Sequence, residues 1–477
     1  MSTHTSPARA ISHAARRMTL FMGSGLGFLI VVGTCSLGAG LLAGLNITIF
    51  AMCAFTVLGT GLCLIGPKSR FVISVVGALF VFQSTLTVLK YGYLVIALLC
   101  FALSVRSVLQ PDGRVRREFR GLVLCSALLF CYLTSTFVVS RSIGTSFEQW
   151  FRDALPYFLL VLLPYIGIAA GPLIAPRWNR RWFIAIGLVV SIGLTADWLE
   201  RRGVSALPVG RFVLSSTVVV ALCFSYAITK AGLLDTTNRW IWGATAIAIL
   251  VAMLLPGTRT NLALLAAFAG VVGSALNSRV EPRRAFGVLA GLILAIIVAT
   301  PLVAQLLISD PNFLNARLND AATVIQGNAE SDPSYAMRKT SYNLTAEALT
   351  DHPALGTGPG YLYPVPPVPT FNLDAPGIVL AKFGFIGLAF IGAFLLSVVA
   401  SVRRIRQTYG PSPAYTACSG WLVVLVVLIP FGPWLEDKGF PIALAMVFAA
   451  VLSEAHGQNT ASNPTRGVLD RSFKGVP

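Results

Sequence analysis

Charged residues are scarce in this sequence of 477 residues. Asp, Glu, Lys and Arg make up 12% of the chain, whereas 55% of the residues are hydrophobic. The mean hydropathy is +0.76. This composition excludes a water-soluble globular protein, because soluble domains carry roughly a quarter of charged residues. It predicts a polytopic membrane protein.

Histidine is also scarce, and the cysteines show no paired spacing. The eight cysteines fall inside or at the edges of apolar stretches without paired spacing, which predicts small buried hydrophobic residues rather than disulfides or metal ligands. Three of the four histidines lie near the ends of the chain, so we expect no metal site and no cofactor. A Ser-His-Asp hydrolase is not indicated either, because no G-x-S-x-G motif is present.

Apolar windows of about 20 residues recur along the chain, and each is long enough to cross the hydrocarbon core. Lipid offers the backbone no hydrogen-bond partners, so these spans should be helices and the fold all-α. About fourteen spans are predicted, close to residues 19–42, 45–66, 70–88, 91–109, 120–139, 150–171, 181–200, 212–230, 239–256, 260–277, 285–307, 374–402, 414–432 and 438–454.

The chain divides into five predicted parts. Residues 1–18 form a basic tail without a convincing cleavage site, so we expect it to be retained in the cytoplasm. Residues 19–307 form a bundle of about eleven spans, and residues 308–373 form an extracytoplasmic loop. Residues 374–454 add about three spans, and residues 455–477 form a second cytoplasmic tail.

The net charge of +17 is sorted along the chain. With the N-terminus inside, 24 of the 36 Lys and Arg residues fall in the tails and in the connections on the cytoplasmic side. Cytoplasmic loops of membrane proteins collect such residues. The positive charge is therefore interpreted as a topology signal, and nucleic acid is not an expected partner.

The long loop has the opposite charge balance, with six acidic and three basic residues. Asp310-Pro311 and Asp332-Pro333 each place a capping residue before a proline, which predicts two short helices. The second helix should begin at Pro333 and end before Pro353. Its predicted apolar stripe consists of Met337, Ser341, Leu344 and Ala348.

Two arginines on the predicted outer side could bind an anion. Arg259 lies between two spans in LLPGTRTNLALL, where an arginine either binds an anion or anchors the span end at the interface. Arg338 shares a face of the second loop helix with Tyr342 and Thr345, and is either a binding residue or a solvated helix charge.

Several residues near these arginines could move a proton. His352 can act as a base, but Asp-His-Pro is also ordinary chemistry for a helix end. Three carboxylates of the same region are equally possible bases, namely Glu347, Asp351 and Asp374.

The remaining candidates are secondary. Gly358 and Gly360 belong to a Gly-Thr-Gly-Pro-Gly sequence that fits a tight turn better than a phosphate cradle. Ionisable residues near the outer span ends are candidates because charge is costly there, and they comprise Arg152 beside Asp153, Asp197, Arg211, Asp374 and the cluster Glu436-Asp437-Lys438.

The segment from about Leu250 to Leu396 resembles the O-antigen ligase and O-antigen polymerase superfamily. Three motifs carry the resemblance: Thr258-Arg259-Thr260, the pattern R-x(13)-H-P-A-L-G-x-G-P-G from Arg338 to Gly360, and K-F-G-F-I-G from Lys382 to Gly387. The N-terminal half is similar only in being polytopic.

The resemblance implies a metal-independent, inverting glycosyltransferase of the GT-C type. Its substrate would be a glycan linked to undecaprenyl diphosphate, at the outer face of the bacterial cytoplasmic membrane. Arg259 and Arg338 would hold the diphosphate, and Asp374, His352 or Glu347 would lie near the acceptor. Membrane lipid and other polysaccharide-assembly proteins are further expected partners.

One departure from the family pattern favours a polymerase, or a ligase-like transferase of another surface polysaccharide, over a lipopolysaccharide ligase. Ligases usually carry a His-Asn pair just before the span that contains G-x-x-G, whereas this chain has Asn372 and Asp374 there but no histidine. A ligase acting on a lipid A-core acceptor is the first alternative. A transporter would require discontinuous helices and mid-membrane charges, and a purely structural partner of an assembly complex would leave the loop arginines dispensable.

Overall fold

The computed structural model describes residues 57–82, 87–109, 115–201, 213–233, 239–254, 266–267, 269–272, 333–365, 369–373, 375–410, 412–428 and 434–462. Within these residues the protein is all-helical, and its only β-pairings are two isolated bridges, Leu109 with Val115 and Tyr363 with Thr370. The predicted all-α class is confirmed.

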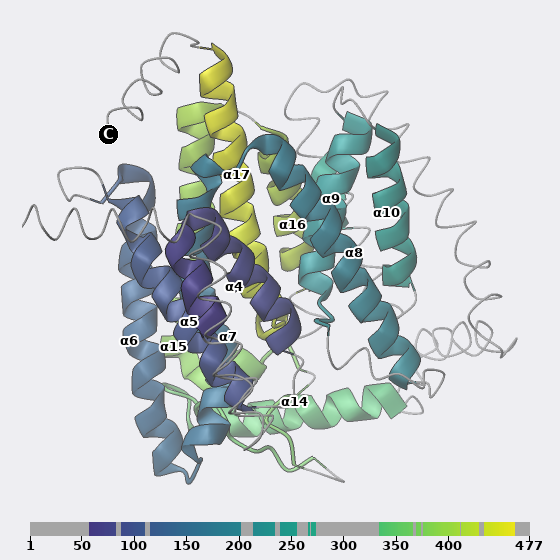
Figure 1. Cartoon of the computed structure of the whole chain (residues 1–477). Helices are drawn as coiled ribbons and strands as arrows, with labels where there is room; N and C mark the ends of the chain where they lie inside the picture. The colour runs from purple at the N-terminus through teal and green to yellow at the C-terminus, as the bar shows by residue number, and fades with distance from the viewer. Residues whose placement is uncertain are drawn as a thin grey trace, which may run out of the picture.

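The helices form a bundle, and α14 lies across one end of it (Figure 1). The α-helices are α4 (Pro67–Val81), α5 (Thr87–Ser104), α6 (Arg120–Ser142), α7 (Phe147–Ala170), α8 (Pro176–Arg201), α9 (Thr217–Ile228), α10 (Arg239–Leu254), α14 (Pro333–Asp351), α15 (Ile378–Tyr409), α16 (Pro413–Leu428) and α17 (Phe440–Ser462). Short turns of 3-10 helix are η1 (Val105–Val108), η2 (Arg117–Phe119), η3 (Gly171–Leu173) and η8 (Trp434–Glu436), and a π-helical turn covers Thr229–Leu233.

Six of the described helical stretches are long and apolar enough to cross a membrane, which supports a membrane protein. They are Leu89–Val108, Arg117–Ser142, Phe147–Leu173, Pro176–Glu200, Ile378–Tyr409 and Phe440–Gln458. Each coincides with a predicted span within a few residues. The total of about fourteen stays a prediction, because the spans expected at 19–42 and 285–307 lie outside the described residues.

Helices α7 and α17 form the centre of the bundle, and nearly all of their apolar residues are buried. They approach closely because small residues face each other. Gly167 on α7 and Gly171 at the start of η3 lie about one turn apart and face the backbone of α17 at Ala445 and Ala449. Small residues at this spacing are typical of membrane helices that pack backbone against backbone.

Helix α14 begins at Pro333 and ends at Asp351, as its Asp-Pro start and Pro353 predict. Its buried face matches the predicted stripe in part, and Leu344 is half-buried. Met337 is 65% exposed, whereas Ser341, Thr345 and Ala348 are buried. Small residues thus face the bundle and pack against the start of α15, where Thr345 lies beside Gly377.

Helix α15 is interrupted at Gly384, whose φ of 60° is left-handed and accessible mainly to glycine. The interruption frees backbone groups that the segment before α15 satisfies. Thr357 and Gly358 donate N–H groups to the carbonyls of Ala381 and Lys382 at 2.9 and 2.8 Å. The N–H groups of Phe385 and Ile386 donate back to carbonyls of Pro353 and Ala354. The remaining 25 residues of α15 still rise about 37 Å, enough to cross a bilayer.

Basic segments that the charge pattern predicts on the cytoplasmic side contact neighbouring segments through their arginine side chains. The Arg404 guanidinium donates to the Arg117 carbonyl at 3.3 Å, and Arg70 donates to the Leu103 carbonyl at 3.0 Å. These contacts join α4 to α5 and α15 to η2.

A substitution of Gly167 tests the α7–α17 contact. We expect Gly167→Ala to destabilise the protein by about 1–3 kcal/mol, because the new methyl group meets the Ala445 backbone, with its Cα 3.0 Å away. Gly243→Ala on α10 is the matched control, because a Cβ there meets no atom within 4 Å. Thermal unfolding in detergent measures both, and equal unfolding temperatures for the two variants would contradict the close packing.

Candidate functional site

The candidate site is built around Lys382, a lysine with no exposed surface. Its ammonium group donates to Asp153 Oδ1 at 2.7 Å and to Glu436 Oε1 at 2.6 Å. A buried charge is tolerated only when it is paired and hydrogen-bonded. Lys382 therefore joins α15 to α7 and to the segment before α17.

Asp153 is positioned by the start of α7. Ser146 and Gln149 form a capping box that begins the helix, and this places Asp153 in its second turn. Its two oxygens are both used, because Oδ1 accepts from Lys382 and Oδ2 accepts from the Gly360 N–H at 2.7 Å. Asp153 thus holds the glycine-rich turn and the lysine at once.

Glu436 is positioned by the turn that precedes α17. Its neighbour Asp437 accepts from the Ser216 hydroxyl at 2.6 Å and from the N–H groups of Val218 and Gly439. This anchors the turn to the start of α9. Glu436 Oε1 accepts from Lys382 and also from the Tyr157 hydroxyl at 3.0 Å.

The Gly-Thr-Gly-Pro-Gly sequence forms a tight turn, as its composition predicts. Gly356, Gly358 and Gly360 all have positive φ values, between 69° and 82°. A side chain at Gly360 would meet the backbone of Gln149 and Trp150 within 2.8 Å, so only glycine allows this approach. The turn packs on α6 and α7, where the Ser140 hydroxyl donates to the Pro359 carbonyl at 2.9 Å.

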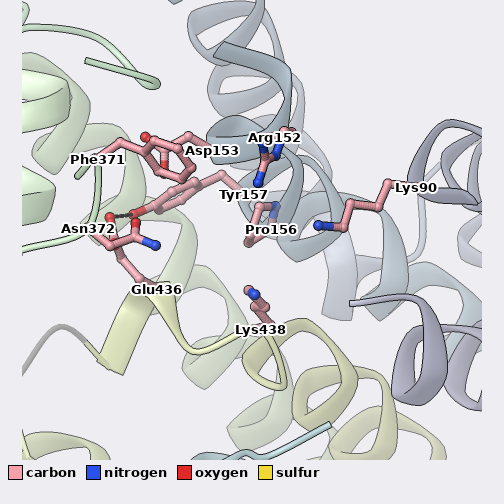
Figure 2. A pocket seen from close by; sticks show the side chains of 9 residues that line it. All are labelled: Lys90, Arg152, Asp153, Pro156, Tyr157, Phe371, Asn372, Glu436 and Lys438. Carbon is pink, nitrogen blue, oxygen red and sulfur yellow. Dashed lines mark hydrogen bonds between the residues drawn. The ribbon is translucent and has the colours of Figure 1, made fainter. Parts of the chain in front are cut away.

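A cleft opens next to this cluster (Figure 2). About 450 Å³ of empty space lies within it, and part of this space is open solvent. It is lined by Lys90, Arg152, Asp153, Pro156, Tyr157, Phe371, Asn372, Glu436 and Lys438.

Three cations converge on the cleft from different elements. Lys90 comes from α5, Arg152 from α7 and Lys438 from the turn before α17, and their charged ends approach the same space in Figure 2. Within the described part of the chain, none of the three forms a salt bridge. Arg152 lies over the ring of Phe371 at 5.7 Å, and Lys438 donates to the Phe82 carbonyl at 3.4 Å. Such a group of cations can bind an anion with several charges.

Burial shifts the acid–base properties of the groups outside the spans. It lowers the pKa of Lys438, and the charge of Arg152 lowers it further although Asp437 acts in the opposite direction. Burial also raises the pKa of the Glu436 carboxyl against the effect of Lys382. The pKa of Tyr363 rises to about 12, mainly through burial. A bound anion would favour the charged form of Lys438.

The structure places the predicted residues of α14 away from the lining of the cleft. Tyr342 and Glu347 are exposed on the helix, and Arg338 is partly exposed near its start. His352 is exposed at the helix end, where its backbone accepts from the Gly356 N–H at 2.9 Å. Their predicted roles stay predictions.

Of the other predicted residues, Arg152 lines the cleft, and Gly358 and Gly360 belong to the turn that binds Asp153 through the Gly360 N–H. Arg259, Arg211 and Asp374 lie outside the described residues. The diphosphate site expected from Arg259 and Arg338, and the base expected at Asp374, therefore also stay predictions.

Sequence reasoning missed Lys90 and the meeting of Lys382 with its two carboxylates. Lys90 is a single lysine within the apolar stretch TVLKYGYLVIALL. Lys382 likewise interrupts an apolar segment, inside K-F-G-F-I-G. A lysine within a span is costly and almost always functional or paired, so this signal was available. Its partners were not, because they lie 229 and 54 positions away.

Comparison with known proteins adds no assignment. No protein-family model matches the chain, and no curated protein matches it significantly. The fold and cleft define an all-helical membrane protein with a charged site at one end of the bundle. Among the described residues, no group of three His, Cys, Asp or Glu side chains could hold a metal ion.

Removal of the central lysine tests the charge cluster. We expect Lys382→Met to cost about 3–5 kcal/mol, because Asp153 and Glu436 are left buried without their cation. Without Lys382, Glu436 binds its proton more tightly in the folded chain than in the unfolded one, so the variant should lose stability as the pH rises from 5 to 8.

Thermal unfolding of the wild type and of Lys382→Met between pH 5 and 8 measures this loss of stability. Lys90→Met is the control, because Lys90 pairs with no carboxylate among the described residues and its loss strands no buried charge. If the difference in stability between the wild type and Lys382→Met stays constant from pH 5 to 8, the pairing of Lys382 with the two carboxylates is contradicted.

Proposed function

We propose that this protein is a membrane glycosyltransferase that polymerises or transfers oligosaccharides linked to undecaprenyl diphosphate. The reaction would take place at the outer face of the bacterial cytoplasmic membrane. The resemblance of residues 250–396 to the O-antigen ligase and polymerase superfamily motivates the proposal. One observation supports it: three cations without a salt-bridge partner among the described residues converge on a cleft beside the turn of Gly358 and Gly360.

The chemistry of the cleft suits a diphosphate leaving group. Negative charge grows on the diphosphate as the bond to the sugar breaks, and fixed cations stabilise that charge without a metal ion. Lys90, Arg152 and Lys438 supply three positive charges, while Lys382 is neutralised by its two carboxylates. Arg259 and Arg338 are proposed as diphosphate ligands on the resemblance alone, because Arg338 does not line the cleft and Arg259 lies outside the described residues. The transfer would be inverting, through direct attack by an acceptor hydroxyl.

A polymerase is favoured over a ligase because the segment from Asn372 to Gly384 contains no histidine. In a polymerase, the acceptor would be a second lipid-linked glycan. In a ligase, it would be a lipid A-core. Other proteins of polysaccharide assembly are proposed as partners in either case.

A transporter of lipid-linked glycans is the second candidate, and the interrupted helix α15 favours it. Transporters often place a discontinuous helix at the substrate. In this chain, however, Gly384 is only the seventh residue of α15, and residues 353–358 bond to the freed backbone. An interruption held in this way near a helix end favours a fixed site over an alternating gate.

The transfer reaction itself tests the cations. With lipid-linked oligosaccharide extracted from a deletion strain as donor, we expect Arg152→Ala, Arg259→Ala and Arg338→Ala each to lower kcat/KM about 100-fold, because each removes a charge from the diphosphate. Arg141→Ala is the matched control, since Arg141 is exposed at the end of α6 and does not line the cleft. Full activity of all three variants, each inserted normally, would contradict the assignment.

The glycan phenotype of a deletion strain distinguishes the polymerase from its alternatives. Loss of a polymerase should leave single repeat units on an otherwise intact anchor. Loss of a ligase should instead leave long polymer on undecaprenyl diphosphate, and loss of a transporter should trap single units inside the cell. Gel electrophoresis of surface glycans and extraction of lipid-linked glycans separate these outcomes.

A further inference from the structure

The oxygens of the Lys382 cluster are not equally occupied. Both oxygens of Asp153 are bound, one by Lys382 and one by the Gly360 N–H. Glu436 Oε1 is bound by Lys382 and Tyr157. Among the described residues, Glu436 Oε2 receives only the side-chain amide of Asn372, at 3.2 Å in the orientation that its neighbours favour. Oε2 therefore has room to accept one more hydrogen bond.

This oxygen belongs to a residue that lines the cleft opposite the cations. In Figure 2, Glu436 and Asn372 lie on one side, and the charged ends of Lys90, Arg152 and Lys438 approach from the others. An anion held by the three cations would thus leave its attached group close to Glu436. The side chain is 12% exposed, whereas that of Lys382 has no exposed surface.

A second buried glutamate shows what a purely structural arrangement looks like. Glu454 in α17 accepts from Lys230 at 2.9 Å and from the Tyr226 hydroxyl at 2.9 Å, as Glu436 does from Lys382 and Tyr157. Its other oxygen, however, is capped by the Ala414 N–H at 2.7 Å. Both glutamates accept from a lysine and a tyrosine through one oxygen. The second oxygen of Glu454 is bound by a backbone N–H, whereas that of Glu436 faces no backbone donor among the described residues.

We propose that Glu436 is the catalytic base that removes the proton from the acceptor hydroxyl through Oε2. This inference rests on the proposed glycosyl transfer. Lys382 and Tyr157 hold the opposite oxygen and so fix the direction of Oε2, which is a positioning role.

The step balances without a metal or a co-reactant. The acceptor hydroxyl gives its proton to Oε2, and its oxygen forms a bond to the anomeric carbon of the donor sugar. The bond between that carbon and the diphosphate breaks, and the diphosphate leaves with the electron pair beside the cations. The proton on Glu436 then passes to solvent through the open cleft.

The charged groups around Glu436 set the pH dependence. Lys382, Asp153 and Tyr157 contact or face it within the cluster, Tyr363 lies nearby, and the cleft adds Lys90, Arg152 and Lys438. Because burial raises the pKa of Glu436, transfer should begin to fall on the acid side at a higher pH than an ordinary glutamate would give. A protonated carboxyl cannot accept the hydroxyl proton.

Matched variants of the two glutamates test the inference in the full-length protein. We expect Glu436→Gln to slow transfer about 100-fold or more, whereas Glu454→Gln should stay within about threefold of the wild type. Both variants lose a buried carboxylate bonded to a lysine and a tyrosine, so both should lose thermal stability. Binding of the lipid-linked donor should be unchanged in Glu436→Gln, and Glu436→Asp should keep an acid limb at a shifted pH.

Three results would overturn the inference. If Glu436→Gln transfers as fast as Glu454→Gln, Glu436 is not the base. If its loss of transfer is matched by an equal loss of donor binding, Glu436 only maintains the shape of the cleft. A wild-type protein that transfers no glycan overturns the proposed function together with this inference, whereas the first two results leave glycosyl transfer in place.

Discussion

Lys382 carries a positive charge into a place that water does not reach, and the surrounding structure has to neutralise it. The two carboxylates that do so come from α7 and from the turn before α17, so a single ammonium group fixes three distant parts of the chain. Buried pairs of this kind add little net stability compared with apolar packing, but they are strongly specific in geometry. The cleft has its shape because this geometry is fixed.

The Gly-Thr-Gly-Pro-Gly turn supports the same site through backbone hydrogen bonds. Gly384 interrupts α15 directly after Lys382, and the N–H groups of Thr357 and Gly358 bind the carbonyls that the interruption exposes. Gly360 in turn donates to Asp153. The two motifs of the resemblance that the structure describes, those ending at Gly360 and beginning at Lys382, are therefore structural neighbours, and their glycines allow close backbone approach.

The sequence was sufficient to predict what depends on local chemistry and on lipid. The six long spans follow from apolar length, and the bounds of α14 follow from Pro333 and Pro353. It could not show that Asp153, Lys382 and Glu436 meet, because the pairing of helices depends on packing between small residues such as Gly167 and Ala445. The prediction that Met337 belongs to the buried face of α14 was also wrong. The buried face of α14 is set by its contact with the start of α15 and not by the hydrophobicity of its side chains.

The order of synthesis gives the lysine cluster a further consequence. Asp153 enters the membrane early, Lys382 follows 229 residues later, and Glu436 arrives another 54 residues after that. Until the turn before α17 has emerged, Lys382 can pair only with Asp153, which balances its charge but satisfies only one of its two carboxylate contacts. The last stage of biogenesis therefore completes the site, because a chain that stops short of Glu436 lacks the second hydrogen-bond partner of the buried ammonium group.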